Sequence, residues 1–209
     1  MKKRNMIWSG AVATMVLLFT VGNASAQVLP NSYFNIDWQV GIPVSEDFAD
    51  KTSGWGMNFE GGYFLTEAIT IGGFINYQTN FGNVPRETLT FKDGNALTTS
   101  QKHAIFQLPF GVTGRYNWLT DAIFQPYVGM KLGASWAQIS SYYYIYKQYT
   151  DTWGFYLSPE VGVSIFPRPD MRFGFHAAFY FSYATNSGDL LTYSVDGLTN
   201  FGFRVGISF

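Results

Sequence analysis

The 209-residue chain is rich in aromatic residues, at 19%, and poor in charged residues, at 13%, against about 25% in ordinary soluble domains. Beyond residue 26 it carries 10 Lys and Arg against 14 Asp and Glu, so it lacks the basic footprint of a nucleic-acid-binding protein and no nucleic-acid partner is expected. It has no cysteine, so disulfides do not hold the fold.

The first residues resemble a secretory signal peptide. Basic residues at 2–4 precede an apolar run at 11–21, and Ala24-Ser25-Ala26 forms a small-x-small cleavage pattern. This layout predicts a signal peptide over residues 1–26, followed by one domain over residues 27–209. The alternative is a retained membrane helix, for which the run is short.

The segment around residue 36 alternates apolar and polar residues. Phe34, Ile36 and Trp38 are separated by Asn35 and Asp37. Period-two alternation predicts a strand with one face in lipid. Seven further segments show the same pattern: 55–65, 69–78, 106–116, 124–136, 153–165, 172–183 and 200–209. The sequence therefore predicts an all-β fold, an eight-stranded antiparallel up-and-down transmembrane β-barrel.

The segments between these strands alternate in length. Longer polar segments occupy about 44–54, 79–102, 139–152 and 184–199, and shorter ones 66–68, 117–122 and 167–170. Outer-membrane barrels have long loops outside and short turns in the periplasm, which predicts periplasmic termini.

Three prolines interrupt the predicted strands. Pro109, Pro126 and Pro159 cannot donate a ladder hydrogen bond, so bulges or local breaks are expected there.

The last strand carries a family resemblance. Apolar residues occupy alternate positions at Phe201, Phe203, Val205, Ile207 and Phe209. This ending resembles the signal that outer-membrane barrels present to their insertion machinery, and implies that machinery as a partner. The chain from residue 27 resembles the small barrels of the OmpA, OmpX and OmpW kind. The glycine- and aromatic-rich composition at 61–67 is similar to that of the outer membrane protein beta-barrel domain group common in Bacteroidetes. The resemblance implies a location among outer-membrane lipid and lipopolysaccharide.

Charged residues also lie on the polar phase of the strands. They form a candidate interior network: Asp37, Glu60, Arg115, Lys131, Glu160, Arg172, His176 and Arg204. An eight-stranded barrel is just wide enough for side chains to fill, and buried charges must be paired. The set predicts a salt-bridged closure of the lumen, with a gated pore or a proton-sensitive site as the alternative. Glu160, Lys131 and His176 are expected in one cluster, with the turn at 167–170 placing Glu160 opposite His176.

The third long segment is dense in tyrosine: Tyr142, Tyr143, Tyr144, Tyr146 and Tyr149. It either continues an aromatic girdle at the headgroup level or forms a contact surface for an extracellular or neighbouring membrane protein. The second long segment carries Arg86, Lys92 and Lys102, which either contact lipopolysaccharide phosphates or remain solvated.

Catalytic chemistry has little support in the sequence. Lipid A-modifying barrels use a His/Ser pair, and His103 lies near Ser100, but segment 181–188 has no histidine. We therefore predict no catalytic residue, metal or cofactor. Two functions remain open: a closed structural or surface-interaction barrel, and a small porin-like channel for small or hydrophobic solutes.

Overall fold

A computed structural model describes residues 31–44, 48–90, 96–120, 122–143, 146–168, 173–190 and 193–209, so the predicted signal peptide lies outside the described residues. Eight strands account for most of the described chain. Their bounds are β1 Ser32–Pro43, β2 Gly56–Phe64, β3 Ile69–Thr90, β4 Ala96–Asn117, β5 Phe124–Tyr143, β6 Tyr146–Ile165, β7 Gly174–Leu190 and β8 Tyr193–Ser208. Within these ranges there is no helix long and apolar enough to span a membrane.

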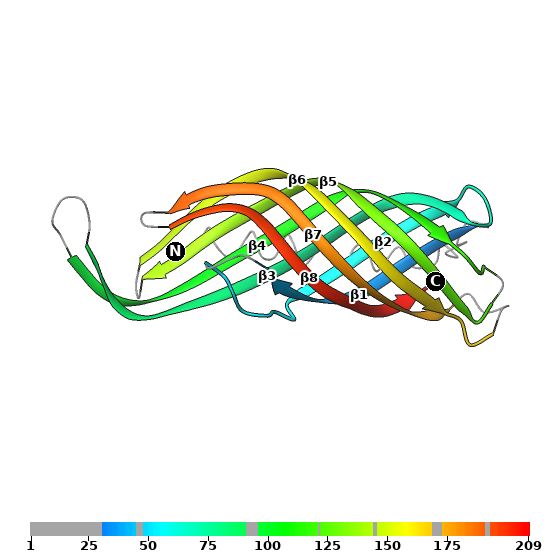
Figure 1. The fold of residues 1–209 in the computed structure, drawn as a ribbon, viewed down its shortest axis with the longest axis horizontal. Helices are drawn as coiled ribbons and strands as arrows, with labels where there is room; N and C mark the ends of the chain where they lie inside the picture. The colour runs from blue at the N-terminus through cyan, green and yellow to red at the C-terminus, as the bar shows by residue number, and fades with distance from the viewer. Residues whose placement is uncertain are drawn as a thin grey trace, which may run out of the picture. The chain divides into compact units, whose positions relative to one another are not determined.

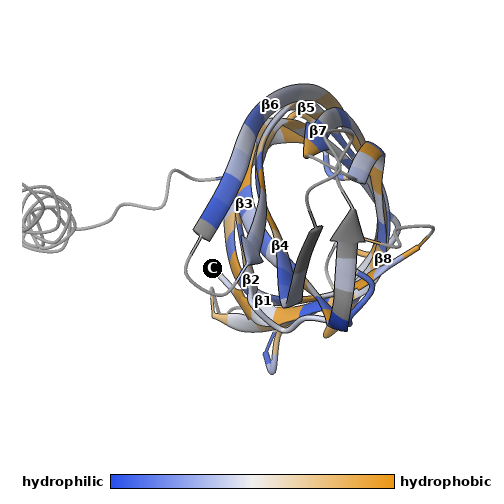
Figure 2. Cartoon of the chain, turned by 90° about the vertical axis from the view of Figure 1, so that its left-hand side faces the viewer, coloured by the Kyte–Doolittle hydropathy of each residue, from blue (hydrophilic) through white to orange (hydrophobic). Residues whose placement is uncertain are grey.

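The strands form one closed antiparallel barrel. Each strand pairs with the next in sequence, and β8 pairs with β1 from Asn35↔Ser208 to Pro43↔Asn200. The ring is visible along the barrel axis in Figure 2. Closure leaves no open edge at this level of the sheet. The predicted fold class and strand number are confirmed.

The two ends of the barrel differ. Three hairpins, β3–β4, β5–β6 and β7–β8, extend at the end that we call the hairpin end, and β3–β4 projects farthest (Figure 1). The described parts of the other connections, residues 65–68, 118–120, 122–123, 166–168 and 173, lie at the opposite end, the turn end, together with the start of β1 and the end of β8 (Figure 1).

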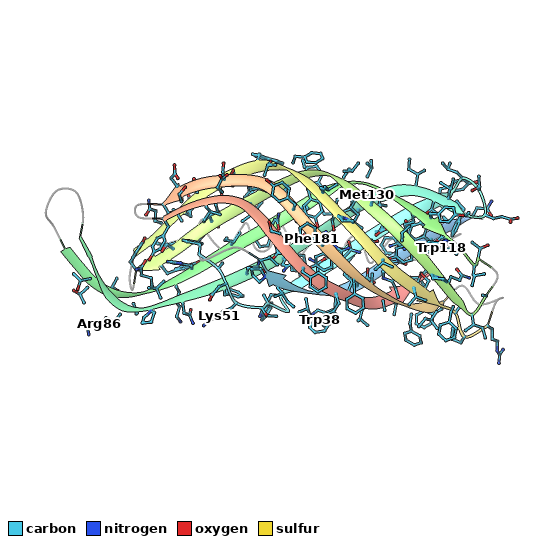
Figure 3. The ribbon with its side chains drawn as sticks, viewed as in Figure 1. Trp38, Lys51, Arg86, Trp118, Met130 and Phe181 are labelled. Atoms are coloured by element: carbon cyan, nitrogen blue, oxygen red, sulfur yellow. The ribbon has the colours of Figure 1, made fainter. Side chains whose placement is uncertain are left out.

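The barrel wall is apolar outside and polar inside. Trp38 and Phe179 are 50% and 60% exposed, whereas Asn35 and Lys131 are fully buried. Met130 and Phe181 lie on the outer surface of the central wall, and Trp118 lies near the turn end (Figure 3). This arrangement suits lipid outside the wall and hydrogen bonding within it.

The strands at the hairpin end are longer than predicted. Residues 79–102 were expected to form a loop, but β3 and β4 remain paired from Thr79↔Phe106 to Thr90↔Ala96, with a register shift between Val84 and Glu87. Likewise β5 and β6 pair up to Tyr143↔Tyr146, and β7 and β8 up to Leu190↔Tyr193. Polar residues can occupy both faces of a hairpin that stands in water. Backbone pairing therefore continues where the apolar alternation stops.

Strand pairing is interrupted beside two of the prolines in the strands, but the register does not change there. The β3–β4 ladder omits Leu108 and Pro109, and the β6–β7 ladder omits Ser158 and Pro159, each with the same register on both sides. Pro126 lies beyond the last β4–β5 pair and faces only β6. The expected local breaks are present, and the ladders show no bulge at these prolines.

Candidate functional site

The barrel interior contains an ion-pair network that crosses the lumen. Lys131 Nζ on β5 lies 2.7 Å from Glu60 Oε2 on β2 and 2.9 Å from Glu160 Oε2 on β6. Arg115 Nε on β4 lies 2.6 Å from Glu60 Oε1, and its Nη2 lies 3.4 Å from Glu160 Oε1. Four strands therefore contribute charges to one buried group, which we call the ion-pair layer.

Arg204 on β8 extends this layer toward the hairpin end. Its Nη1 pairs with Glu160 Oε2, and its Nε donates to Gln39 Oε1 over 2.8 Å. Gln39 Nε2 donates to Gln78 Oε1 over 2.5 Å, and Gln78 Nε2 donates to Asn80 Oδ1 over 3.0 Å. A chain of hydrogen-bonded polar side chains thus continues from the ion pairs toward the hairpin end.

His176 joins the network through Asp37 and Tyr127. Its Nδ1 lies 2.7 Å from Asp37 Oδ1, and its Nε2 lies 2.6 Å from the Tyr127 hydroxyl, which also lies 3.1 Å from Glu160 Oε1. The prediction that a turn at 167–170 places Glu160 roughly opposite His176 is wrong. The β6–β7 register pairs Glu160 with Tyr180 and His176 with Ser164, because the chain between these strands is longer than the turn that was assumed.

Interior glycines let the charged residues meet across an intervening strand. Arg115 and Glu160 both pair with Gly129 of β5, one from each side. A Cβ on Gly129 would lie 3.1 Å from Glu160 Cγ and 3.3 Å from Arg115 Cγ. The missing side chain therefore leaves the space through which the two residues approach each other.

The rings of two buried tyrosines also occupy the space beside interior glycines. The Tyr127 ring lies over Gly162, where a Cβ would come within 2.7 Å of Tyr127 Cζ, and this places its hydroxyl beside His176. The Tyr180 ring lies over Gly202, and its hydroxyl donates to Gln78 Oε1 over 2.9 Å. The rings also receive cations, since Arg115 Cζ lies 4.1 Å from the Tyr127 centroid. Such contacts stabilise buried guanidinium groups.

The interior charges of the described residues are balanced. Three carboxylates oppose three cations when His176 is neutral: Asp37, Glu60 and Glu160 against Arg115, Lys131 and Arg204. Arg172, the remaining predicted member, lies outside the described residues.

A second buried cluster lies at the hairpin end, where residues 48–53 contact the inner face of the barrel mouth. Phe48 is 5% exposed, stacks on His103 at a centroid distance of 4.0 Å, and meets the Tyr193 ring edge-on. His103 Nδ1 lies 3.0 Å from the Phe48 carbonyl oxygen. Residues 48–53 are also fixed by the bridges Gly41↔Ser53 and Lys51↔Phe81. We call residues 48–53 the mouth plug.

The sequence analysis missed the mouth plug and the inward Phe74. Phe48 was the single aromatic residue in a segment interpreted as a polar loop, and this was the one available signal. Phe74 is 5% exposed and packs toward Tyr156 inside the barrel. It is an aromatic residue on the inward phase of its strand, which otherwise carries polar residues and glycine over residues 70–78.

Comparison with known proteins identifies the family. The outer membrane protein beta-barrel domain matches residues 11–209. The chain belongs to this outer-membrane β-barrel family. Neisserial surface protein A has a similar fold, with a TM-score of 0.55 and 16% identity, over 85% of this chain and 96% of that protein. The attachment invasion locus protein Ail of Yersinia pestis aligns with a TM-score of 0.47 and 12% identity, over 85% and 97%. Comparison with curated protein sequences gave no significant match.

Membership of the outer-membrane β-barrel family makes the chain an integral outer-membrane protein. The apolar outer wall therefore contacts the lipid of that membrane. Its outward row includes Phe201 and Val205 of the predicted insertion signal, at 46% and 49% exposure. Phe203 and Ile207 are half-buried on the same face, and Phe209 exchanges backbone hydrogen bonds with Phe34 over 2.9 and 3.0 Å.

The predicted tyrosine surface of this outer-membrane barrel needs one correction. Tyr142 and Tyr149 are 41% and 57% exposed, but Tyr143 is buried and points into the barrel. Strand alternation places consecutive residues on opposite faces, so Tyr142 and Tyr143 cannot share a surface. Tyr144 and the side chain of Tyr146 lie outside the described residues.

The His/Ser arrangement considered for lipid A chemistry does not form between the two residues first considered. His103 is buried in the mouth, whereas Ser100 is exposed. A hydroxyl nucleophile needs its base within hydrogen-bond reach.

Proposed function

We propose that this outer-membrane barrel has a closed lumen and acts as a structural scaffold that presents its hairpin end for surface interactions. The observation that carries this proposal is the ion-pair layer. Lys131 bridges Glu60 and Glu160 at 2.7 and 2.9 Å across a lumen of only eight strands. Side chains can fill a barrel of this size completely. The mouth plug forms a second barrier, with Phe48 stacked on His103.

The proposed orientation has the hairpin end outside the cell and both termini in the periplasm. It is supported by the short connection 65–68 and by residues 118–120, which lie with the start of β1 and the end of β8 (Figure 1). Small outer-membrane barrels carry their short turns on the periplasmic side.

A planar-bilayer conductance measurement tests the closed lumen. We expect no steady single-channel steps from the purified protein. The variant pair Lys131→Met with Glu160→Gln removes one charge of each sign and keeps the interior neutral. Steady steps in the wild-type protein that change in this double variant would support a channel and overturn the closed lumen. Steps of identical size in both proteins would indicate a contaminating porin, and a repurified sample free of them must then be silent.

Cysteine labelling tests the orientation, because the chain has no cysteine of its own. Thr98 is exposed on the β3–β4 hairpin, and Leu119 is 55% exposed at the turn end. On intact cells a membrane-impermeant maleimide should label Thr98→Cys and leave Leu119→Cys unlabelled. The reverse pattern would place the hairpins in the periplasm.

A further inference from the structure

Four outward-facing residues lie on one line across four strands at the hairpin end. The registers align Asn83 of β3 with Lys102 of β4, Lys102 with Tyr142 of β5, and Tyr142 with Lys147 of β6. All four are exposed. Neighbouring strands are about 4.8 Å apart, so the backbones of the two lysines lie roughly 10 Å apart.

A third lysine joins this line from the mouth plug. In the amide orientation that satisfies both groups, Lys51 Nζ donates to the side-chain oxygen of Asn83 over 2.8 Å. Lys51 lies toward the hairpin end of the barrel (Figure 3). Lys51, Lys102 and Lys147 therefore form a continuous cationic line on the outer wall, which we call the lysine row.

The last member of the lysine row is held in position by aromatic rings. Lys147 Nζ lies 5.4 Å from the Tyr142 centroid and 5.2 Å from the Tyr149 centroid, and it donates to Gln138 Oε1 over 3.4 Å. Two exposed tyrosines thus hold this ammonium group on the outer face of the wall.

The nearby carboxylates do not neutralise the lysine row. Asp151 accepts from Gln138 Nε2 over 2.9 Å, and Asp50 is exposed next to Lys51 in the chain. Across the described parts of the chain, no carboxylate forms an ion pair with these three lysines. Among the described residues, therefore, no carboxylate competes with an external anion for the lysine row.

The height of the row identifies where that anion must lie. Trp136 pairs with Trp153, which is 65% exposed, six positions nearer the apolar wall than Tyr142 and Lys147. Tryptophan marks the membrane–water interface. Six strand residues at about 3.3 Å each, tilted by about 45°, place the lysine row roughly 14 Å above that interface. This level is above the acyl chains and beside the sugar–phosphate headgroups of the outer leaflet.

We infer that the lysine row binds phosphate groups of lipopolysaccharide lying beside the barrel. The inference rests on the outward orientation in the proposed function. Three ammonium groups on a line match several phosphates on one glycolipid headgroup. Because the side chains point sideways from the wall, they meet a membrane neighbour more directly than a ligand approaching the barrel mouth.

The test measures binding of phosphorylated rough lipopolysaccharide to the folded full-length mature protein in detergent, with dephosphorylated lipopolysaccharide as the matched probe. The triple variant K51Q/K102Q/K147Q should bind the phosphorylated form about tenfold more weakly, since exposed ion pairs each contribute modestly. The control Arg168→Gln, which removes one exposed cation at the turn end, should bind as the wild type does. The triple variant K51R/K102R/K147R should retain binding.

Three results would overturn the inference: equal binding of both lipopolysaccharide forms, an unchanged affinity in the lysine-to-glutamine triple variant, or an equal loss in Arg168→Gln. Inorganic phosphate is the second probe. Its displacement of lipopolysaccharide at equal phosphate concentration would assign the row to a free anion instead. The Thr98→Cys labelling result separates a failed binding site from a wrong orientation, because labelling reports only which side the hairpins occupy.

Discussion

His176 and Asp37 lie on strands that do not pair with each other, yet His176 Nδ1 is 2.7 Å from Asp37 Oδ1. Gly206 of β8 pairs with both residues, one on each side. A Cβ on Gly206 would lie 2.5 Å from Asp37 Oδ1. The contact between β7 and β1 therefore depends on a glycine in the strand that separates them.

Gly206→Ala should destabilise the barrel by about 1–3 kcal/mol, because the added methyl group would overlap the Ile36 carbonyl oxygen and lie 2.5 Å from Asp37 Oδ1. Gly114→Ala is the matched control. Its nearest neighbour would be Thr70 O at 3.8 Å, an ordinary contact, so its effect should stay within about 0.5 kcal/mol. Denaturant unfolding in lipid vesicles, followed by tryptophan fluorescence, measures both. Equal stability of the two variants would contradict the requirement for a glycine at position 206.

Glu160→Gln should cost about 3–5 kcal/mol, because it leaves three buried cations facing two carboxylates. Asp151→Asn, on the exposed wall, should cost under about 1 kcal/mol. Adding Lys131→Met to Glu160→Gln restores the charge balance, so the double variant should lose less stability than the sum of the single losses. The same unfolding assay measures the single and double variants of this double-mutant cycle. Strict additivity would show that Lys131 and Glu160 act independently.

Phe48→Ala should release the mouth plug, because stacking on His103 anchors this segment. Hydrogen exchange is the readout. The amides of Lys51 and Ser53 donate to Phe81 O and Gly41 O, both over 2.9 Å, and their protection should fall in the variant. Asp50→Asn alters an exposed neighbour and should leave protection unchanged. Undiminished protection in Phe48→Ala would mean that the backbone bridges alone hold the plug.

Met130→Arg should cost about 2–4 kcal/mol, because Met130 lies on the central apolar wall (Figure 3) and a cation is least tolerated near the bilayer midplane. Phe81→Arg, at 39% exposure near the hairpin end, should cost at most about 1 kcal/mol. Refolding yield and unfolding free energy in vesicles distinguish the two positions. Similar costs would mean that the lipid boundary lies elsewhere on the wall.

Alternation along the strands was sufficient to predict the barrel. Apolar Phe34, Ile36 and Trp38 alternate with polar Asn35 and Asp37, because consecutive strand residues face lipid and a polar lumen in turn. The same rule assigned charged residues such as Glu60, Lys131 and Glu160 to the lumen, and these side chains are buried in the structure. It failed at residues 79–102, where both faces of the β3–β4 hairpin tolerate polar residues and no alternation marks the strand.

The sequence by itself determined which face each membrane strand turns to lipid, and so the strand number and the location of the protein. Only the tertiary structure decided which interior residues meet. His176 contacts Asp37 across Gly206, and Arg115 contacts Glu160 across Gly129, because the register between strands sets these rows. The lysine row has the same origin. Lys51, Lys102 and Lys147 are far apart in the chain, and backbone hydrogen bonding brings them together.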